Sequence, residues 1–424
     1  MQKRARPKRD EWRWIQELIP GKEPRLLPCA SGPRKGQIYP VAETRFVGNE
    51  RRYLNQCIDS NWVSSKGPFI RKFEQAFAPQ AGCDFAVPCA SGTVALHLVL
   101  AALGLGPGDE VIVPAFTMIA VANAVRYTGA SVKLVDVEPV TLNLDPALVE
   151  AAVTPRTKAI VVVHTYGHPA PMHLFQRIAQ AHNLYLIEDA AEAHGAEISN
   201  RRVGGFGLAG TFSFYANKII TTGEGGMVTT NDRRLAAMVR RLRDQAFHPE
   251  RHFWHEHVGF NYRMTNLQAA VGLAQTERFD AIVAARRQLR TWYDEQLGSI
   301  PGLQLPIEAR GVRSVFWMYA VRTNSDFGCS TDELRSQLAR RGIETRSFFI
   351  PIHLQPIYID QFRGQRFPVA EQLCKSGLYL PTHENLGERD ADWICAQVRD
   401  IQGRANETAR RVVAQDAPRR SIRP

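Results

Sequence analysis

Lys218 is the residue whose surroundings point most directly to chemistry. It follows the run Phe212–Asn217, in which aromatic and small residues predominate, and it precedes a glycine-rich turn at residues 221–226. A lysine held among such neighbours has a lowered pKa, because burial disfavours the charged ammonium. A neutral lysine amine can form a Schiff base with a carbonyl compound. The alternative for any single lysine is a solvated surface side chain.

A second candidate is the segment Ala90–Thr93, which lies between a short apolar run and a helical apolar pattern. The start of a helix offers free N–H groups and the positive end of the helix dipole. Ser91 and Thr93 add hydroxyl groups, and Ser213 is a further hydroxyl that can reach a phosphate. The segment therefore suits phosphate binding, with an ordinary Ser or Thr N-cap as the alternative.

Asp189 is a third candidate because it ends the apolar strand pattern Tyr185–Glu188. Ligands of open α/β sheets bind at the carboxyl ends of the strands. A carboxylate there can pair with the protonated pyridine nitrogen of pyridoxal 5′-phosphate (PLP) and keep that ring an electron sink. A helix-capping role is the alternative for Asp189. His194, five residues later, is either close to a ligand or a structural histidine.

The order of these candidate residues along the chain favours one class of enzyme. A helix start at Gly92, Asp189 about 100 residues later and Lys218 about 30 residues further on follow one another as in PLP enzymes of the aspartate-aminotransferase superfamily. A second glycine pattern, at positions 205, 207 and 210, has the spacing of a dinucleotide fingerprint. That fingerprint requires a following helix, whereas a strand pattern follows here, so a Rossmann site is not expected.

The elements around these residues alternate between strand and helix patterns from about residue 85 to 230. Such alternation predicts an α/β fold with a mostly parallel sheet covered by helices on both faces. A long helical pattern follows at residues 267–297, and residues 298–402 mix strands with helices. We expect a large PLP-binding domain at 37–275 and a smaller α+β domain at 276–402, with extensions at 1–36 and 403–424.

The net charge of +11 lies mostly in the two extensions. Residues 1–36 hold ten Lys or Arg and four acids, and residues 403–424 hold six Arg and two acids. A basic tail by itself is a weak signal for nucleic acid. We therefore expect solvated extensions, with a short helix allowed at Trp12–Ile19, and no specific nucleic-acid partner.

Location and ligand class are also constrained by composition. No apolar run approaches the roughly 18 residues of a membrane span, and no secretory signal pattern follows the basic N-terminus. Seven scattered cysteines are typical of free thiols in a reducing compartment. The sequence predicts a cytoplasmic protein without a membrane partner and without a metal site.

Several segments together resemble the DegT-type family of PLP-dependent sugar aminotransferases, which has the aspartate-aminotransferase-like fold (PLP fold type I). The resemblance covers roughly residues 38–400. The segments that carry it are Trp62–Pro68, Ala90–Thr93, Gly108–Pro114, His164–Gly167, Ile187–Gly195, Phe212–Met227 and Gly259–Asn266.

The resemblance implies a role for individual residues. Lys218 matches the Schiff-base lysine and Asp189 the partner of the pyridine nitrogen. Gly92, Thr93 and Ser213 match phosphate-binding positions, beside Ser91. Asn261 matches an asparagine that reaches the phosphate of the neighbouring subunit's cofactor, which implies a homodimer or a larger assembly such as a tetramer. Candidate substrate contacts are Glu192, His194 and Arg263.

Some positions depart from the common pattern of the family, and one segment indicates a particular branch of it. Met118 stands where many relatives place an aromatic ring over the cofactor, and a thioether can still pack on a ring face. Pro171 stands where relatives often carry an acid, and we have no physical account of that change. The Glu192-Ala193-His194-Gly195 form resembles the GDP-perosamine synthase branch, whose members aminate C4 of a GDP-linked 4-keto-6-deoxy sugar.

The resemblance therefore implies ping-pong transfer of an amino group from L-glutamate to a nucleotide-linked keto-sugar. Three alternatives stay open: a cyclitol aminotransferase, a 3-keto-sugar aminotransferase and a non-catalytic regulatory member of the family. Intact Lys218 and Asp189 argue against the last. A dehydratase on this scaffold would carry His in place of Lys218.

Overall fold

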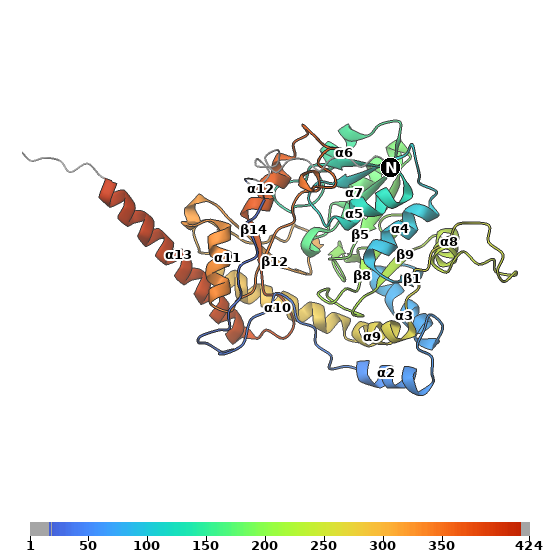
Figure 1. Ribbon diagram of the computed structural model, residues 1–424, viewed down its shortest axis with the longest axis horizontal. Coiled ribbons are helices and arrows are strands. Elements are labelled where there is room, and N and C mark those ends of the chain that lie inside the picture. Colours follow the sequence, from blue (N-terminus) through green and yellow to red (C-terminus); the bar gives the residue numbers. More distant parts are fainter. Residues whose placement is uncertain (1–16, 18, 417–424) are drawn as a thin grey trace, which may run out of the picture.

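The computed structural model describes residue 17 and residues 19–416, and its side chains through residue 407. The helix that the sequence allows at Trp12–Ile19 lies almost wholly outside these residues. Within the described residues the chain forms a large sheet, a four-stranded sheet and a three-stranded sheet. Figure 1 shows the large sheet with its helices on one side of the molecule and helices α10, α11 and α13 on the other.

The large sheet has seven strands in the order β1-β9-β8-β5-β4-β2-β3. The pairs from β8 through β3 are parallel, and β9 runs antiparallel to both of its neighbours. The strands are β1 Phe85–Cys89, β2 Glu110–Pro114, β3 Ser131–Val135, β4 Thr157–Val163, β5 Tyr185–Asp189, β8 Ala209–Ser213 and β9 Gly226–Thr230. The expectation of a mostly parallel sheet is confirmed.

Helices cover both faces of this sheet because its strands carry apolar side chains on both sides. On β2, Val111 and Val113 belong to one buried cluster and Ile112 to another. The first cluster includes residues of α3 Pro68–Phe77, α4 Gly92–Ala102, α5 Ala120–Thr128, α8 Arg233–Arg243 and α9 Asn266–Glu277. The second includes residues of α6 Pro146–Ala152 and α7 Met172–His182. Helix α2, Glu50–Asp59, packs outside against α9.

The C-terminal part has its own apolar cluster, built on an antiparallel sheet in the order β10-β12-β14-β13. These strands are β10 Leu303–Gln304, β12 Tyr319–Thr323, β13 Arg346–Ser347 and β14 Gly377–Leu380. The helices around it are α10 Phe279–Leu297, α11 Thr331–Arg340, α12 Pro368–Ser376 and α13 Glu388–Asp416. The α+β character expected for this part is confirmed.

A small third sheet joins the two parts. It consists of β11 Val312–Arg313, β6 Glu197–Ile198 and β7 Arg201–Arg202. Strand β11 comes from the C-terminal part, and it pairs antiparallel with β6, which follows the Asp189 strand. The segment just after β11 is thereby held against the loop that follows β5.

Several boundaries differ from the sequence-based expectation. The helical pattern at 267–297 is two helices, α9 and α10, which meet at Arg278. The expected domain boundary at 275 falls inside α9, and α13 runs across the one at 402. Figure 1 shows the end of α13 projecting from the body of the molecule.

The described part of the N-terminal extension contacts the C-terminal domain at a few points, although most of its side chains are exposed. The Leu27 N–H donates to the Ala339 carbonyl at 3.0 Å, and Cys29 is only 2% exposed within the C-terminal apolar cluster. Arg34 pairs with Asp390 of α13 at 3.4 Å. Residues 19–36 therefore act as part of the C-terminal domain.

Candidate active site

Lys218 lies in the irregular segment between β8 and β9, with its side chain largely buried. Its Nζ is 3.8 Å from Oε1 of Glu192 and 3.7 Å from the ring centroid of Trp317. Burial lowers the pKa of Lys218, while the charges of Glu192 and Asp189 oppose that shift. The apolar setting and lowered pKa inferred from the sequence are both present.

Glu192 is the carboxyl group nearest to this amine. The Tyr166 N–H donates to its Oε2 at 2.8 Å, which leaves Oε1 facing Lys218. Burial raises the pKa of Glu192 to about 7, although Lys218 and the Tyr166 N–H act in the other direction. A carboxyl group with a pKa near neutrality can hold or release a proton beside the amine.

Asp189 is buried at the carboxyl end of β5, where the sequence placed it. Its Oδ1 accepts a hydrogen bond from the Ala191 N–H at 3.0 Å. Burial raises the pKa of Asp189, against the Ala191 hydrogen bond and the charge of Lys218. A cationic N–H partner stabilises a buried carboxylate at this position, and the protonated pyridine ring of PLP would supply such a partner.

The phosphate-binding candidates lie together at the start of α4. Ser91 is the N-cap, and its Oγ accepts a hydrogen bond from the Val94 N–H at 3.3 Å. The ordinary capping role thus applies to Ser91, while the N–H groups of Gly92 and Thr93 have no acceptor within the helix. A Cβ on Gly92 would lie 2.7 Å from Cβ of Ser213, so β8 brings the Ser213 side chain directly to the helix start.

The segment with Asn261 and Arg263 runs beside this helix start, since the Ala90 N–H donates to the Tyr262 carbonyl at 2.9 Å. Asn261 is exposed, and its Oδ1 accepts from Arg263 Nη2 at 2.7 Å. Arg263 also pairs with Asp244 at 2.6 Å. Met118 is 52% exposed. This exposure is expected of a side chain that packs on a ligand rather than on protein.

His194 is packed among aromatic side chains, and the charge of Lys218 also acts on its ring. It is fully buried, and its ring contacts Phe77, Phe212 and Phe214 at centroid distances of 6.4, 5.3 and 5.7 Å. Burial lowers the pKa of His194 to about 3, so the ring is neutral. The structure places His194 in the core behind the site, and the expected substrate contact has no support in this arrangement.

Trp317 is a site residue that the sequence analysis missed. It comes from the C-terminal part, and no short motif marks it, because its neighbour Lys218 lies about 100 residues earlier in the chain. Its indole N–H donates to the Asn217 carbonyl at 2.8 Å. The available signal was an isolated tryptophan in an apolar run, which alone indicates only core packing.

The glycine pattern at 205–210 has a structural role around Glu188. The carboxylate of Glu188 accepts hydrogen bonds from the N–H groups of Gly204, Phe206 and Gly207 at 2.8, 2.6 and 2.7 Å. It also contacts His164 Nε2 at 3.1 Å. His164 Nδ1 accepts from the Ala170 N–H at 3.0 Å, so Nε2 carries the proton that it donates to Glu188. The backbone N–H groups of this segment therefore bind an internal carboxylate.

The site residues fit PLP in their chemistry. A buried amine with a lowered pKa, a buried carboxylate at a strand end, and a helix start with an adjacent serine hydroxyl match the aldehyde, the ring nitrogen and the phosphate of that cofactor. Within the described residues, no group of three or more His, Cys, Asp or Glu side chains is arranged to hold a metal ion.

Comparison with known proteins identifies the family of the chain. The model of the DegT/DnrJ/EryC1/StrS aminotransferase family matches residues 46–399. The chain belongs to this family. It is 49% identical to the GDP-perosamine synthase of Caulobacter vibrioides over 85% of this chain and 97% of that protein. It is 42% identical to the GDP-perosamine synthase of Escherichia coli O157:H7 over 85% and 98% of the two chains.

A solved structure agrees with the fold. DesV of S. venezuelae superposes with a TM-score of 0.79 and 38% identity, over 84% of this chain and 94% of that one. The family, together with relatives named as synthases and a solved aminotransferase structure, makes the chain a PLP-dependent aminotransferase with the expected fold. No helix among the described residues is long and apolar enough to cross a membrane.

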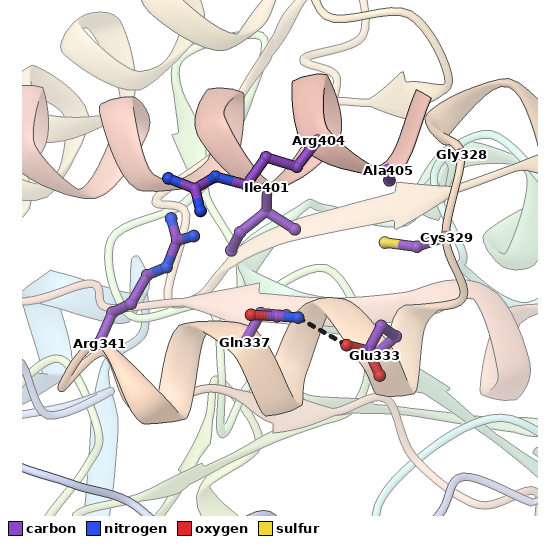
Figure 2. A pocket seen from close by; sticks show the side chains of 8 residues that line it. All are labelled: Gly328, Cys329, Glu333, Gln337, Arg341, Ile401, Arg404 and Ala405. Atoms are coloured by element: carbon purple, nitrogen blue, oxygen red, sulfur yellow. Dashed lines mark hydrogen bonds between the residues drawn. The ribbon is translucent and has the colours of Figure 1, made fainter. Parts of the chain in front are cut away.

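A pocket in the C-terminal domain is separate from this site. Figure 2 shows it between α11 and the C-terminal half of α13, and its volume is about 470 Å³. Two of its polar groups bind each other, since Gln337 donates to Glu333 at 2.8 Å, and Arg341 pairs with Asp400 outside the lining at 2.7 Å. Because none of its lining residues reaches Lys218 or the helix start of α4, it has no part in the chemistry described above.

Proposed function

We propose that this aminotransferase moves the amino group of L-glutamate to C4 of a GDP-linked 4-keto-6-deoxyhexose, as a GDP-perosamine synthase does. The observation that carries the proposal is the buried Lys218 amine, which faces Glu192 beside Asp189. The identity with two proteins named GDP-perosamine synthase, over nearly their whole length, supports the choice of substrate.

The residues divide the chemistry among them. PLP, when bound, supplies an electron sink for the carbanion that transamination creates. Asp189 would hold the proton on the ring nitrogen, and Lys218, once its amine is free, would move a proton at the reacting carbon as base and then as acid. Glu192 sits 3.8 Å from that amine and would take up or return the proton that Lys218 exchanges.

The assembly we propose is a homodimer or a larger multiple of it, in which Asn261 of one subunit contributes to the phosphate site of the next. The exposure of Asn261 in the single chain supports this, because a second subunit can reach its side chain. Closed two-fold dimers are the commonest soluble oligomers. For Arg263, the partly exposed side chain beside the helix start supports a contact with anionic substrate groups.

We propose a cytoplasmic location. All seven cysteines are unpaired in the structure, which fits a reducing compartment. The sugar acceptor then has to be present in that same compartment as a nucleotide-linked keto-sugar.

The test is a panel of nucleotide-linked 4-keto-6-deoxy and 3-keto hexoses, carrying GDP, dTDP or UDP, with L-glutamate as donor. Product would be followed by mass spectrometry, and 2-oxoglutarate by a coupled assay. We expect the highest kcat/KM with a GDP-linked 4-keto-6-deoxy sugar. A preference for a 3-keto sugar or a cyclitol ketone would overturn the proposed substrate but leave the aminotransferase assignment intact.

A further inference from the structure

Two side chains from distant parts of the sequence enclose the amino group of Lys218. The carboxyl group of Glu192 lies 3.8 Å from Nζ, and the ring of Trp317 lies 3.7 Å from Nζ, measured to the centroid. Glu192 follows β5 in the large domain, whereas Trp317 directly precedes β12 of the C-terminal domain. The C-terminal domain thus supplies a wall of the lysine site.

The indole is fixed in place by both its ring and its backbone. Its Nε1–H donates to the carbonyl of Asn217 at 2.8 Å, so the ring that covers the amine also holds the backbone next to Lys218. The Trp317 carbonyl accepts from Arg286 Nη1 at 3.0 Å, and the same Nη1 donates to the Thr382 carbonyl at 2.7 Å. Arg286 is itself buried, so this anchor is shielded from water.

The aromatic neighbours continue this wall toward Glu192. The Tyr166 ring lies nearly parallel to the Trp317 ring, at a centroid distance of 6.4 Å and an interplanar angle of 27°. The backbone N–H of Tyr166 in turn holds Glu192 at 2.8 Å. Both walls of the lysine site therefore meet at Tyr166, and a shift of either would move the other.

We propose that Trp317 is a positioning residue of the transamination site, whose ring face holds the amino group of Lys218 against Glu192 where the cofactor aldehyde arrives. This inference rests on the proposed role of Lys218. A lysine has a long flexible stem, and a cation near an aromatic face is attracted to it. The ring therefore limits the positions that the amine can take before it reacts.

The experiment measures Schiff-base formation in cofactor-free protein, without any sugar substrate. The Lys218 amine attacks the aldehyde carbon of added PLP, a C=N bond forms, and the aldehyde oxygen leaves as water with the two amine protons. The visible absorbance of the product gives the rate. Pyridoxamine phosphate, which lacks the aldehyde, serves as a probe of binding alone, by fluorescence titration.

The variants are Trp317→Met and Trp317→Phe, with Trp393→Met as the control. Met fills space without a ring face, Phe keeps a ring face, and Trp393 packs against the C-terminal core away from Lys218. We expect Trp317→Met to slow Schiff-base formation about tenfold or more, since the ring face that confines the amine is lost and a small displacement of a reacting group is costly. Trp317→Phe should stay within about threefold of the parent rate, and affinity for pyridoxamine phosphate should stay within about threefold in every variant.

Three results would overturn the proposal: a parental rate in Trp317→Met, equal slowing in the Met and Phe variants, or a parallel loss of pyridoxamine phosphate affinity. The last would mean that Trp317 only supports the fold. Borohydride reduction and peptide mapping of the parent protein show separately whether Lys218 is the lysine that reacts. A different lysine there would contradict the proposed function rather than the effect of Trp317.

Discussion

Glu188 and Asp189 are adjacent carboxylates at the end of one strand, and they serve opposite sides of it. Successive side chains of a strand point to opposite faces. Glu188 turns to His164 and the N–H groups of the glycine segment, and Asp189 lies on the side of Lys218. One carboxylate therefore stabilises the fold, and the other is available for chemistry.

We predict that Glu188→Gln destabilises the protein in a pH-dependent way. Burial raises the pKa of Glu188, but the hydrogen bonds from His164, Gly204 and Gly207 outweigh burial and hold that pKa below its usual value. A carboxyl group with a depressed folded-state pKa adds stability above its unfolded pKa, which is about 4.5, and loses it as the pH falls through the folded value. The variant should lose about 2–4 kcal/mol at pH 7.

The measurement is the urea unfolding midpoint of parent and variant from pH 3 to 8, and the gap between them should shrink below about pH 4.5. Glu256→Gln is the matched control, because Glu256 forms an exposed ion pair with Arg241. That control should change stability little at any pH, because an exposed ion pair contributes little. A constant gap across the pH range would contradict the charged state assigned to Glu188.

At Lys218 we predict that Lys218→Ala lowers transamination by about three orders of magnitude or more, since one residue serves as Schiff-base partner and as proton carrier. Affinity for pyridoxamine phosphate should change little, because the proposed phosphate contacts lie at the start of α4. Lys158→Ala, on the exposed side of β4, is the control. Substantial turnover in Lys218→Ala without added amine would remove Lys218 from its role.

The sequence could reveal a site residue where the neighbouring residues in the chain mark it. Lys218, Asp189 and the α4 start stood out because each is marked by its immediate neighbours. The two readings of His194 could not be separated from the sequence because its burial depends on three phenylalanines, one of them over 100 residues earlier. Trp317 was missed because its contact with Lys218 exists only after the C-terminal domain has docked.

Among the elements, the start of α4 depends on close approach between three segments. Gly92 sits against Ser213 of β8, and a Cβ added to Gly226 of β9 would collide with the Ser91 carbonyl. Small residues at these positions let a helix N-terminus and two strand ends share one space. The phosphate site that we propose here therefore depends on the packing between these elements as well as on the helix dipole.

We predict that Gly92→Ala weakens binding of pyridoxamine phosphate about tenfold or more, because the new Cβ would lie 2.7 Å from Cβ of Ser213 and the helix start must shift. Isothermal titration calorimetry would give the affinity. Gly106→Ala is the control, because its Cβ would meet only the Thr128 carbonyl, at 3.8 Å. Parental affinity in Gly92→Ala would show that the phosphate binds elsewhere.

The sequence predicted the type of most elements better than their ends. The pattern at 267–297 continues through Arg278, and only tertiary packing separates α9 from α10 there. Conversely, the apolar pattern at 314–321 is typical of one strand, but β12 begins only at Tyr319, because the residues before it leave the sheet to contact the large domain. Trp317 lies in that departing segment, which brings its ring to Lys218.

For the whole molecule, the proposed sharing of sites between subunits can be tested by complementation. If Asn261 serves the neighbouring subunit, a mixture of Lys218→Ala and Asn261→Ala proteins should form hybrid dimers with one complete site each. After random exchange, such a mixture should regain roughly a quarter of parental activity, since half the dimers carry one intact site of two. Sedimentation would confirm the dimer, and no recovery after exchange would place Asn261 in its own subunit's site.

The N-terminal extension contains a segment that contacts the C-terminal domain, whereas most of the net charge lies further out, at both ends of the chain. Residues 19–36 pack on the C-terminal domain through Cys29, so deleting residues 1–36 should lower the melting temperature. Residues 1–16 and 417–424 together hold nine Lys or Arg and two acids, which is seven of the eleven net charges. Removing only these residues therefore tests their charge without removing the packed segment.

Two accounts of that charge compete. Steering of an anionic nucleotide sugar would speed its association and would weaken as salt screens the field. Steering, however, requires charges close to the cleft, and the sequence gives no reason to place these there. We predict that the protein without residues 1–16 and 417–424 keeps kcat and KM for the nucleotide sugar within about threefold, a change of about 0.6 kcal/mol. Steady-state kinetics at 20 and 300 mM salt would decide, because a tenfold higher KM at low salt that vanishes at high salt would establish steering instead.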